Sequence, residues 1–506
     1  MAHSGVPPQS GSYSDRVRRN SLTSRARVRV SWPHLLAVIA AGVLLALCGL
    51  PLAWSAVTPV PLALALWLVA SGGSARNVAG RMFWLTSAYF AVQLSWLTRF
   101  MTDLSGLPFG GALVVPLFLL EGAFYAVMAL VAVSAFRDRL ARVWALAGGW
   151  VVLEWLRTLG PLAFPWSDLG YTLLPTPAAQ TADLWGKLGL TFLVTFTAAS
   201  LVSLALRRYA APVIAALLWA GSWAYGTTRA AQDGPTRQAL VLRSAFDSFG
   251  RASGNLTAEQ QFQTLTALSA DTRPGEIVVW SETALIDQAD LGRVPGPGIY
   301  GVYRYPNNSA VSWDGTSQGS VTYDKLKPVP MGEYFPFETG VLRPVWEQVF
   351  NLLGFRFDPP PIGQSTRPLP LQGVLYGTYI CYDSIFSWVP RQLTLNGAQV
   401  LVNISNDGWY KGWGVTQHFQ MGRMRAIETR RWVLRSVNEG VAASIDDLGR
   451  PVRTLGAGAG ALHVTYRVLN GRTVYVTFGD WPALTLALLL LGAAGVRERR
   501  SRRPNI

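Results

Sequence analysis

The sequence predicts a polytopic α-helical membrane domain joined to a separate α/β domain, and three observations support this fold class. Half of the 506 residues are hydrophobic and only 14% are charged, well below the quarter that is usual in soluble domains. Apolar stretches of bilayer length recur through residues 34–228. Residues 229–478 instead alternate short apolar runs with polar turns and helical stretches. A chain of this length also predicts two or more domains.

Eight apolar segments are long enough to predict transmembrane helices. They are residues 34–50, 53–71, 82–100, 110–134, 143–160, 187–206, 211–227 and 481–496. The first resembles a signal peptide because arginines precede it, but further spans follow at once, so we expect it to remain in the mature protein. The connections "GGSARNVAGR", "FRDRLAR" and "RRY" are basic, whereas those between them are not. This alternation places both termini in the cytoplasm.

These segments divide the chain into five parts. The predicted parts are a basic cytoplasmic tail (1–33), a seven-helix transmembrane domain (34–228), an extracytoplasmic α/β domain (229–478), an eighth transmembrane helix (479–497) and a basic cytoplasmic tail (498–506). The two tails hold a large share of the net charge of +15. Nucleic-acid binding would require basic residues interleaved with aromatic ones on a folded surface, so we expect no nucleic-acid partner. Two cysteines cannot form a disulfide framework.

Short apolar runs in the outer domain are typical of buried strands. They are "QALVLRS", "EIVVWSE", "VLYGTYIC", "AQVLVNIS" and "VAASIDDLG". Helical stretches separate several of them, notably Thr416 to Arg435. Alternating strands and helices predict an α/β domain.

Four sites near predicted strand ends hold polar groups that the apolar pattern does not explain. They are Glu282 in "VVWSETAL", Lys325 and Glu333 in "YDKLKPVPMGEYFPFE", Cys381 in "GTYICYDSIF", and the loop of "LVNISNDGWY". Side chains just beyond strand ends converge on one rim in α/β folds, and ligands bind there.

Glu282, Lys325 and Cys381 supply the three groups that a thiol enzyme needs. A cysteine at a strand-to-helix turn can gain thiolate character. A carboxylate can take the thiol proton, and a lysine can stabilise an oxyanion. The spacing alone leaves two alternatives open: loop charges are often only solvated, and a lone cysteine is often a small buried residue. Lys327 is an alternative to Lys325 as the catalytic cation.

Several longer motifs raise the enzyme hypothesis. These motifs are spread over nearly the whole chain and follow one another in a characteristic order. They are "FPWSDLGY", "WSETA", "YDKLKPVPMGEYFP", "GTYICYD" and the block from Asn403 to Arg450. In this respect the chain resembles the apolipoprotein N-acyltransferases, a membrane-embedded family within the nitrilase superfamily. The resemblance implies an αββα sandwich with Glu282 as general base, Lys325 as the cation that stabilises the transition state, and Cys381 as the nucleophile that becomes a thioester.

The same resemblance implies roles for neighbouring residues. Glu333 would assist the lysine or the incoming amine, Tyr382 follows the nucleophile, and Asn308 would lie near the pocket. The family usually has glutamate where this chain has Asp383. The segment "RSAFDSFGRAS" and the short loop after Glu282 also depart from the family pattern, and we expect these departures to affect the mouth of the pocket.

The family's activity would be a two-stage acyl transfer in the bacterial inner membrane. An acyl chain would pass from a phospholipid to Cys381, and then to the α-amino group of a diacylglyceryl-cysteine at a lipoprotein N-terminus. We expect ping-pong kinetics, no cofactor, no metal and a monomer. The alternatives are a membrane-anchored nitrilase-type amidase that uses water, and a non-catalytic lipid-binding or transport protein.

Other polar features predict structural roles. "GTSQG" matches the serine-hydrolase pattern G-x-S-x-G, but a strand-like run follows it, so we expect a hairpin turn. The four histidines are scattered, which argues against a zinc site, and His418 is expected to be structural. Glu154 lies one helical turn from Arg157, which predicts an internal pair. Glu121 has no partner nearby in the sequence, and its role stays open.

Overall fold

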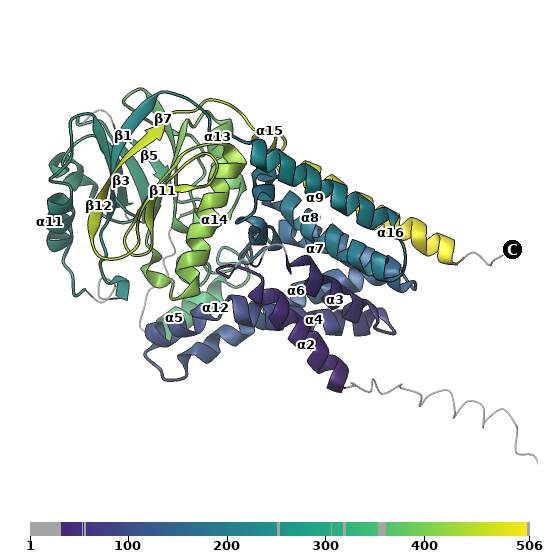
Figure 1. The fold of residues 1–506 in the computed structure, drawn as a ribbon. Coiled ribbons are helices and arrows are strands. Elements are labelled where there is room, and N and C mark those ends of the chain that lie inside the picture. Colours follow the sequence, from purple (N-terminus) through teal and green to yellow (C-terminus); the bar gives the residue numbers. More distant parts are fainter. Residues whose placement is uncertain are drawn as a thin grey trace, which may run out of the picture.

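The computed structural model describes residues 32–52, 54, 57–249, 254–304, 306–316, 320–352 and 361–502. Figure 1 shows a bundle of helices beside a domain built on β-strands, with α16 returning to the bundle after the last strand. The predicted basic tail 1–33 and the end of the tail 498–506 fall largely outside the described residues.

Each predicted apolar range overlaps at least one helix. The helices are α2 (Trp32–Leu47), α3 (Pro59–Ala70), α4 (Ala75–Gln93), α5 (Trp96–Ser105), α6 (Val115–Val133), α7 (Arg139–Leu156), α8 (Ala182–Ala205), α9 (Ala210–Thr228) and α16 (Trp481–Ser501). The predicted single span 82–100 is wrong in its boundaries, because α4 ends at Gln93 and α5 begins at Trp96. The polar and charged residues of α5 make it amphipathic rather than apolar throughout.

Three helical stretches in the described part of the chain are long and apolar enough to cross a membrane. They are Gly110–Val133, Pro177–Ala205 and Trp481–Ser501. Helices α2 and α3 are apolar but shorter. The number of eight crossings therefore stays a prediction.

In the described residues, the α/β domain contains twelve strands in one sheet. They are β1 (Thr236–Arg243), β2 (Glu276–Val279), β3 (Gly298–Arg304), β4 (Asn307–Trp313), β5 (Val321–Asp324), β6 (Leu369–Leu371), β7 (Val374–Ile380), β8 (Val400–Ser405), β9 (Val433–Val437), β10 (Ala442–Ile445), β11 (Pro451–Leu455) and β12 (Gly460–Arg467). The order is β5-β4-β3-β2-β1-β9-β8-β7-β6, with β12 beside β1, and β10 and β11 beside β9. Strands β1 and β9 share a single registered pair, Arg243 with Val437. The sheet is thus two half-sheets joined at one point.

The alternation of side chains along β1 shows that the two half-sheets pack face to face. Ala239 and Val241 belong to the large core shared with the strands of the other half. Leu240 and Leu242 point the other way and pack with Phe262 of α11 (Ala258–Leu268). Both faces of β1 are therefore buried, one by a sheet and one by a helix.

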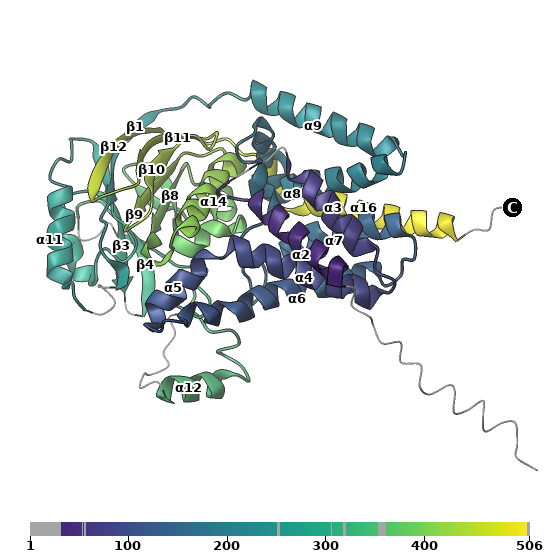
Figure 2. The same cartoon turned by 60° about the horizontal axis from the view of Figure 1, so that its bottom comes forward.

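Helices cover the outer faces of both half-sheets. Figure 1 shows α11 on one side of the strands, and α13 (Trp388–Leu395) and α14 (Trp413–Thr429) on the other, next to the helical bundle. This arrangement agrees with the predicted αββα sandwich. Helix α12 (Arg343–Leu352) stands off from both half-sheets in Figure 2.

The predicted helix from Thr416 to Arg435 is wrong at its C-terminal end. Helix α14 ends at Thr429, and Arg430 adopts a left-handed conformation with φ of 51°. Residues 433–437 form β9, a fully buried strand parallel to β8. A strand buried on both faces lacks the alternation that distinguishes a strand from a helix in sequence.

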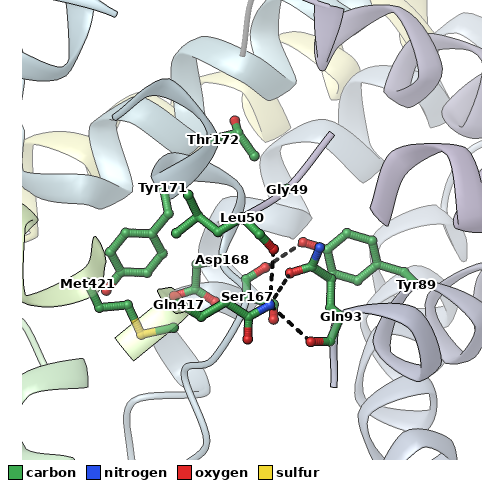
Figure 3. Close-up of a pocket in the computed structure, with 10 residues that line it drawn as sticks. All are labelled: Gly49, Leu50, Tyr89, Gln93, Ser167, Asp168, Tyr171, Thr172, Gln417 and Met421. Atoms are coloured by element: carbon green, nitrogen blue, oxygen red, sulfur yellow. Dashed lines mark hydrogen bonds between the residues drawn. The ribbon is translucent and has the colours of Figure 1, made fainter. Parts of the chain in front are cut away.

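Helix α14 connects the two domains through Gln417. The amide nitrogen of Gln417 donates to the carbonyl oxygens of Leu50 and Gln93, both at 3.0 Å. Its amide oxygen accepts from the indole nitrogens of Trp96 and Trp166 at 3.1 and 2.7 Å. Figure 3 shows Gln417 hydrogen-bonded to Leu50 and Gln93. These residues line a cavity of about 10 Å³, about the room that one water molecule needs.

A cluster of buried charges corrects the prediction for Glu154. Arg157 does not pair with Glu154 but with Glu121 and Asp168, each at 2.8 Å. Lys187 also contacts Asp168. Glu154 instead accepts from Trp150 Nε1, Thr191 Oγ1 and the Leu169 backbone amide. The partner of Glu121, left open by the sequence, is thus Arg157.

We expect Arg157→Met to destabilise the protein strongly, because it leaves the buried Glu121 carboxylate without its cation and leaves Asp168 with Lys187 alone. Losing one partner of a buried ion pair costs about 3–5 kcal/mol. Unfolding of the detergent-purified protein would measure the loss. Arg99→Met is the matched control, because Arg99 pairs with Asp103 at 4.0 Å on the surface and exposed pairs contribute less than about 1 kcal/mol. Equal stability of the two variants would contradict the prediction.

Candidate active site

Lys325 lies between two carboxylates in a buried pocket at the strand ends. Its Nζ is 3.0 Å from Glu282 Oε1, just beyond β2, and 2.8 Å from Glu333 Oε2. Both Lys325 and Glu282 are buried. Burial alone would lower the pKa of Lys325, but the charges of Glu282 and Glu333 outweigh it and hold that pKa well above its usual range. The lysine therefore stays a cation.

Hydrogen bonds fix both carboxylates in place. Asn308 Nδ2 donates to Glu282 Oε1 at 2.7 Å, and the Asn406 backbone amide donates to Glu282 Oε2 at 2.8 Å. The Val329 amide donates to Glu333 Oε2 at 2.8 Å. The predicted site residues Glu282, Lys325, Glu333 and Asn308 thus lie in one network.

Cys381 begins a short 3₁₀ turn, Cys381–Ile385, directly after β7. Its φ of 46° is a left-handed conformation, which is costly for a residue with a Cβ and is often found at functional sites. Burial, together with the negative charge of Glu282, raises the pKa of the thiol to about 12, although Lys325 acts in the opposite direction. At neutral pH the resting thiol is protonated and must lose its proton as it reacts.

The alternative cation Lys327 does not join this network. Its Nζ lies 5.1 Å from the centre of the Phe386 ring and 5.6 Å from that of Trp388. The position of Lys325 between the two glutamates favours it over Lys327.

Tyr382 and Asp383 hold the turn of Cys381 from two sides. The Tyr382 hydroxyl donates to the Ala163 carbonyl at 3.3 Å, and its ring stacks on Phe164 of the helical domain. Asp383 is fully buried and accepts from the amides of Ile380 and Lys327 at 3.0 and 2.7 Å. Asp383 therefore connects the turn that carries Cys381 to the loop that carries Lys325.

A buried network that involves His418 lies next to the turn of Cys381. His418 Nδ1 is 2.9 Å from Asp407 Oδ1, and its Nε2 is 2.6 Å from Ser384 Oγ and 3.2 Å from the Cys381 carbonyl oxygen. Arg435 donates to the other oxygen of Asp407 at 2.6 Å. These contacts are consistent with the predicted structural role of His418, which is to support the turn.

A cavity of about 290 Å³ opens beside the carboxylates. Glu282, Glu333, Asn308, Asn406, Gln261 and Trp409 line part of its wall. Its wall is partly polar and partly apolar, so a ligand with both characters fits it.

The remaining motifs lie away from this pocket. Strands β4 and β5 pair antiparallel on either side of "GTSQG", which agrees with the predicted hairpin, although residues 317–319 of that motif lie outside the described part of the chain. In the described ranges, no group of three or more histidine, cysteine or acidic side chains is placed to hold a metal ion.

Sequence analysis singled out the "NISNDGWY" loop but none of its residues. The structure places the Tyr410 hydroxyl 3.7 Å from Cys381 Sγ, and the Asn406 amide on Glu282. Trp96 and Trp166, from the helical domain, pack against the Tyr410 ring. Contacts between such distant segments leave no local pattern in a sequence.

Comparisons with known proteins match both domains. Residues 41–200 match the family model described as "Apolipoprotein N-acyltransferase N-terminal domain", and residues 258–469 match "Carbon-nitrogen hydrolase". A solved carbon-nitrogen hydrolase from Helicobacter pylori G27 is 16% identical with a TM-score of 0.33, and covers 46% of this chain and 89% of its own. The two family models define the class of protein, which is a helical domain fused to a carbon-nitrogen hydrolase domain.

Curated relatives extend the match to nearly the full length. A protein named apolipoprotein N-acyltransferase from Azotobacter vinelandii is 32% identical, and the alignment covers 94% of this chain and 97% of the relative. One of the same name from Gloeobacter violaceus is 31% identical, with 95% and 97% covered. The chain belongs to the apolipoprotein N-acyltransferase family.

The environment of Asp383 makes its contribution to the unfolding free energy depend on pH. Burial raises the pKa of Asp383 from 3.8 to about 6. Because the folded state holds this proton more tightly than the unfolded state, the contribution of Asp383 is fully present below pH 4 and is lost as the pH rises through about 6.

We therefore expect the unfolding free energy of the wild type, minus that of Asp383→Asn, to fall by about 2 kcal/mol between pH 4 and pH 7, because the unfolded carboxyl is already partly ionised at pH 4. Denaturant unfolding in detergent at several pH values would measure it. A difference that is constant, or that grows with pH, would contradict the prediction.

Proposed function

We propose that this protein transfers a fatty acyl chain from a phospholipid to the α-amino group of the diacylglyceryl-cysteine at a bacterial lipoprotein N-terminus. The observation that carries the proposal is the buried pair of Glu282 and Lys325 beside the Cys381 thiol, in a chain that matches named acyltransferases over nearly its full length. The roles below are those that the family motifs predicted.

In the first stage Glu282 takes the thiol proton as the Cys381 sulfur attacks an ester carbonyl of the phospholipid. The carbonyl oxygen becomes an oxyanion that Lys325 stabilises by its charge. When the tetrahedral intermediate collapses, the ester C–O bond breaks, and the proton held by Glu282 passes to the lysophospholipid alkoxide. The acyl chain remains on sulfur as a thioester.

In the second stage the α-amine of the lipoprotein attacks the thioester carbonyl. The amine must be neutral to attack, and the carboxylates of Glu282 and Glu333 at the cavity are placed to accept its protons. The C–S bond breaks, the proton that the carboxylate took from the attacking amine passes to the sulfur, and the product is an amide. A covalent intermediate between two substrates gives ping-pong kinetics.

Exclusion of water favours transfer over hydrolysis. Cys381 is only 3% exposed, and the next residue, Tyr382, stacks on Phe164 of the helical domain. A dry thioester would survive until an amine arrives. The amidase alternative requires water at that same position, and a non-catalytic lipid-binding protein does not require a buried carboxylate–lysine pair beside a thiol.

The proposal includes a topology in the bacterial inner membrane. Eight helices would cross it, with residues 229–478 outside the cytoplasm and both termini inside, and the protein would act as a monomer. Both substrates are lipid-anchored, so a membrane domain lets them reach the site without leaving the bilayer.

Purified protein incubated with acyl-labelled phospholipid and a diacylated lipopeptide would test the reaction. The proposal expects amide-linked label on the peptide and one lysophospholipid per transfer. Labelled free fatty acid alone would indicate a hydrolase, and unreacted substrates would indicate a binding protein. Either result would overturn the proposal.

Cys381→Ala should abolish transfer and the labelled acyl-enzyme, a loss of at least about 10³-fold. Cys48→Ala is the matched control, because Cys48 is also buried but lies at the end of α2 in the helical domain. Its activity should stay close to that of the wild type. Transfer by Cys381→Ala would disprove the thioester mechanism.

A further inference from the structure

The Cys381 sulfur has a neighbour that the proposed mechanism has not used. The Tyr410 hydroxyl lies 3.7 Å from Sγ, within hydrogen-bonding distance for the larger sulfur atom. Among the described residues this hydroxyl has no other hydrogen-bond partner. Its proton is therefore available to the sulfur.

The nearby Ser405 hydroxyl is less available. Ser405 Oγ donates to Asp407 Oδ1 at 2.6 Å, so its single proton is already used by a charged acceptor. Tyr410 is thus the uncommitted hydroxyl donor at the thiol.

The Tyr410 ring is held from both domains. Its backbone amide donates to the Asp407 carbonyl at 2.9 Å, and its ring contacts His418 with centroids 4.9 Å apart. From the helical domain, Trp96 and Trp166 pack on it at centroid distances of 5.3 and 5.4 Å. The indole nitrogens of these two tryptophans both donate to Gln417, which fixes their orientation. A ring packed on several sides holds its hydroxyl at the sulfur with little entropy to lose.

We propose that Tyr410 is a further catalytic residue, whose hydroxyl donates a hydrogen bond to the Cys381 sulfur whenever that sulfur carries negative charge. This inference rests on the proposed function. In the first stage the thiol proton moves to Glu282, and Tyr410 keeps its own proton while its O–H stabilises the developing thiolate. In the second stage the C–S bond breaks, and the same O–H stabilises the departing sulfur until it is reprotonated.

The hydrogen bond compensates for the environment of the thiol. Burial and the Glu282 carboxylate disfavour the thiolate. The charged and titratable groups around the sulfur are Glu282, Lys325, Asp407 and His418. Replacing the Tyr410 hydroxyl changes none of them, so its own contribution can be measured.

Tyr410→Phe in a Cys48→Ala background tests the inference, because Cys381 is then the one thiol in the chain. The readout is the rate of Cys381 alkylation by iodoacetamide as a function of pH, followed by mass spectrometry of the full-length protein in detergent. Because the thiol pKa lies far above neutral pH, a rise of about one unit is read as slower alkylation at every pH near neutral, by about threefold, since a more basic thiolate is also more nucleophilic. The acylation burst with labelled phospholipid should slow by about tenfold, with KM unchanged.

Tyr379→Phe is the matched control. Tyr379 lies near the end of β7, two residues before Cys381, and is fully buried. Its hydroxyl has no hydrogen-bond partner among the described residues. Its removal should leave the alkylation profile unchanged. A Tyr410→Phe profile equal to that of Tyr379→Phe would overturn the inference, even if Tyr410→Phe unfolds at a lower temperature, because the hydroxyl would then serve packing only. The alkylation assay needs no lipid substrate, so this failure is distinct from failure of the proposed function.

Discussion

The site depends on the charge balance around Lys325. A buried ammonium group is stable only if nearby carboxylates compensate its lost hydration, and Glu282 and Glu333 both lie within 3.0 Å of it. The same two contacts hold the pKa of Lys325 well above its usual range, so the lysine stays charged beside Glu282. The Asn308 side chain, on β4, and the Asn406 amide, just after β8, both donate to Glu282. Strands of both half-sheets therefore position the pair of Glu282 and Lys325.

The helical domain forms one wall of this site as well as a membrane anchor. Trp96 and Trp166 donate to Gln417 and pack on Tyr410, and Ala163 accepts from Tyr382. Buried polar contacts of this kind resist sliding, because each displaced donor would lose its partner. The contacts of Tyr382 and Tyr410 therefore fix the surroundings of Cys381 against the helical domain.

Many elements of the fold, and the candidate site residues, could be predicted from the sequence, because they leave local patterns in it. The apolar segments, the strands β1, β2, β7, β8 and β10, and the site residues Glu282, Lys325 and Cys381 all leave local patterns. Strand β9 did not, because a strand buried on both faces shows no alternation. The partner of Arg157 was mispredicted, because Glu121 lies 36 residues away, whereas sequence reasoning offered only the neighbour one turn away, Glu154.

Asp383 stands where the family usually has glutamate, and its contacts show how the shorter side chain is accommodated. Its shorter carboxylate still accepts from Ile380 and Lys327, and Tyr323 supplies a third hydrogen bond at 2.8 Å. Three donors satisfy a buried acceptor that burial would otherwise disfavour. A side chain longer by one methylene would have to fit where Asp383 is already fully buried. Through Ile380, Asp383 positions the turn in which Cys381 has its strained φ. Through Lys327, the same carboxylate positions the loop that carries Lys325.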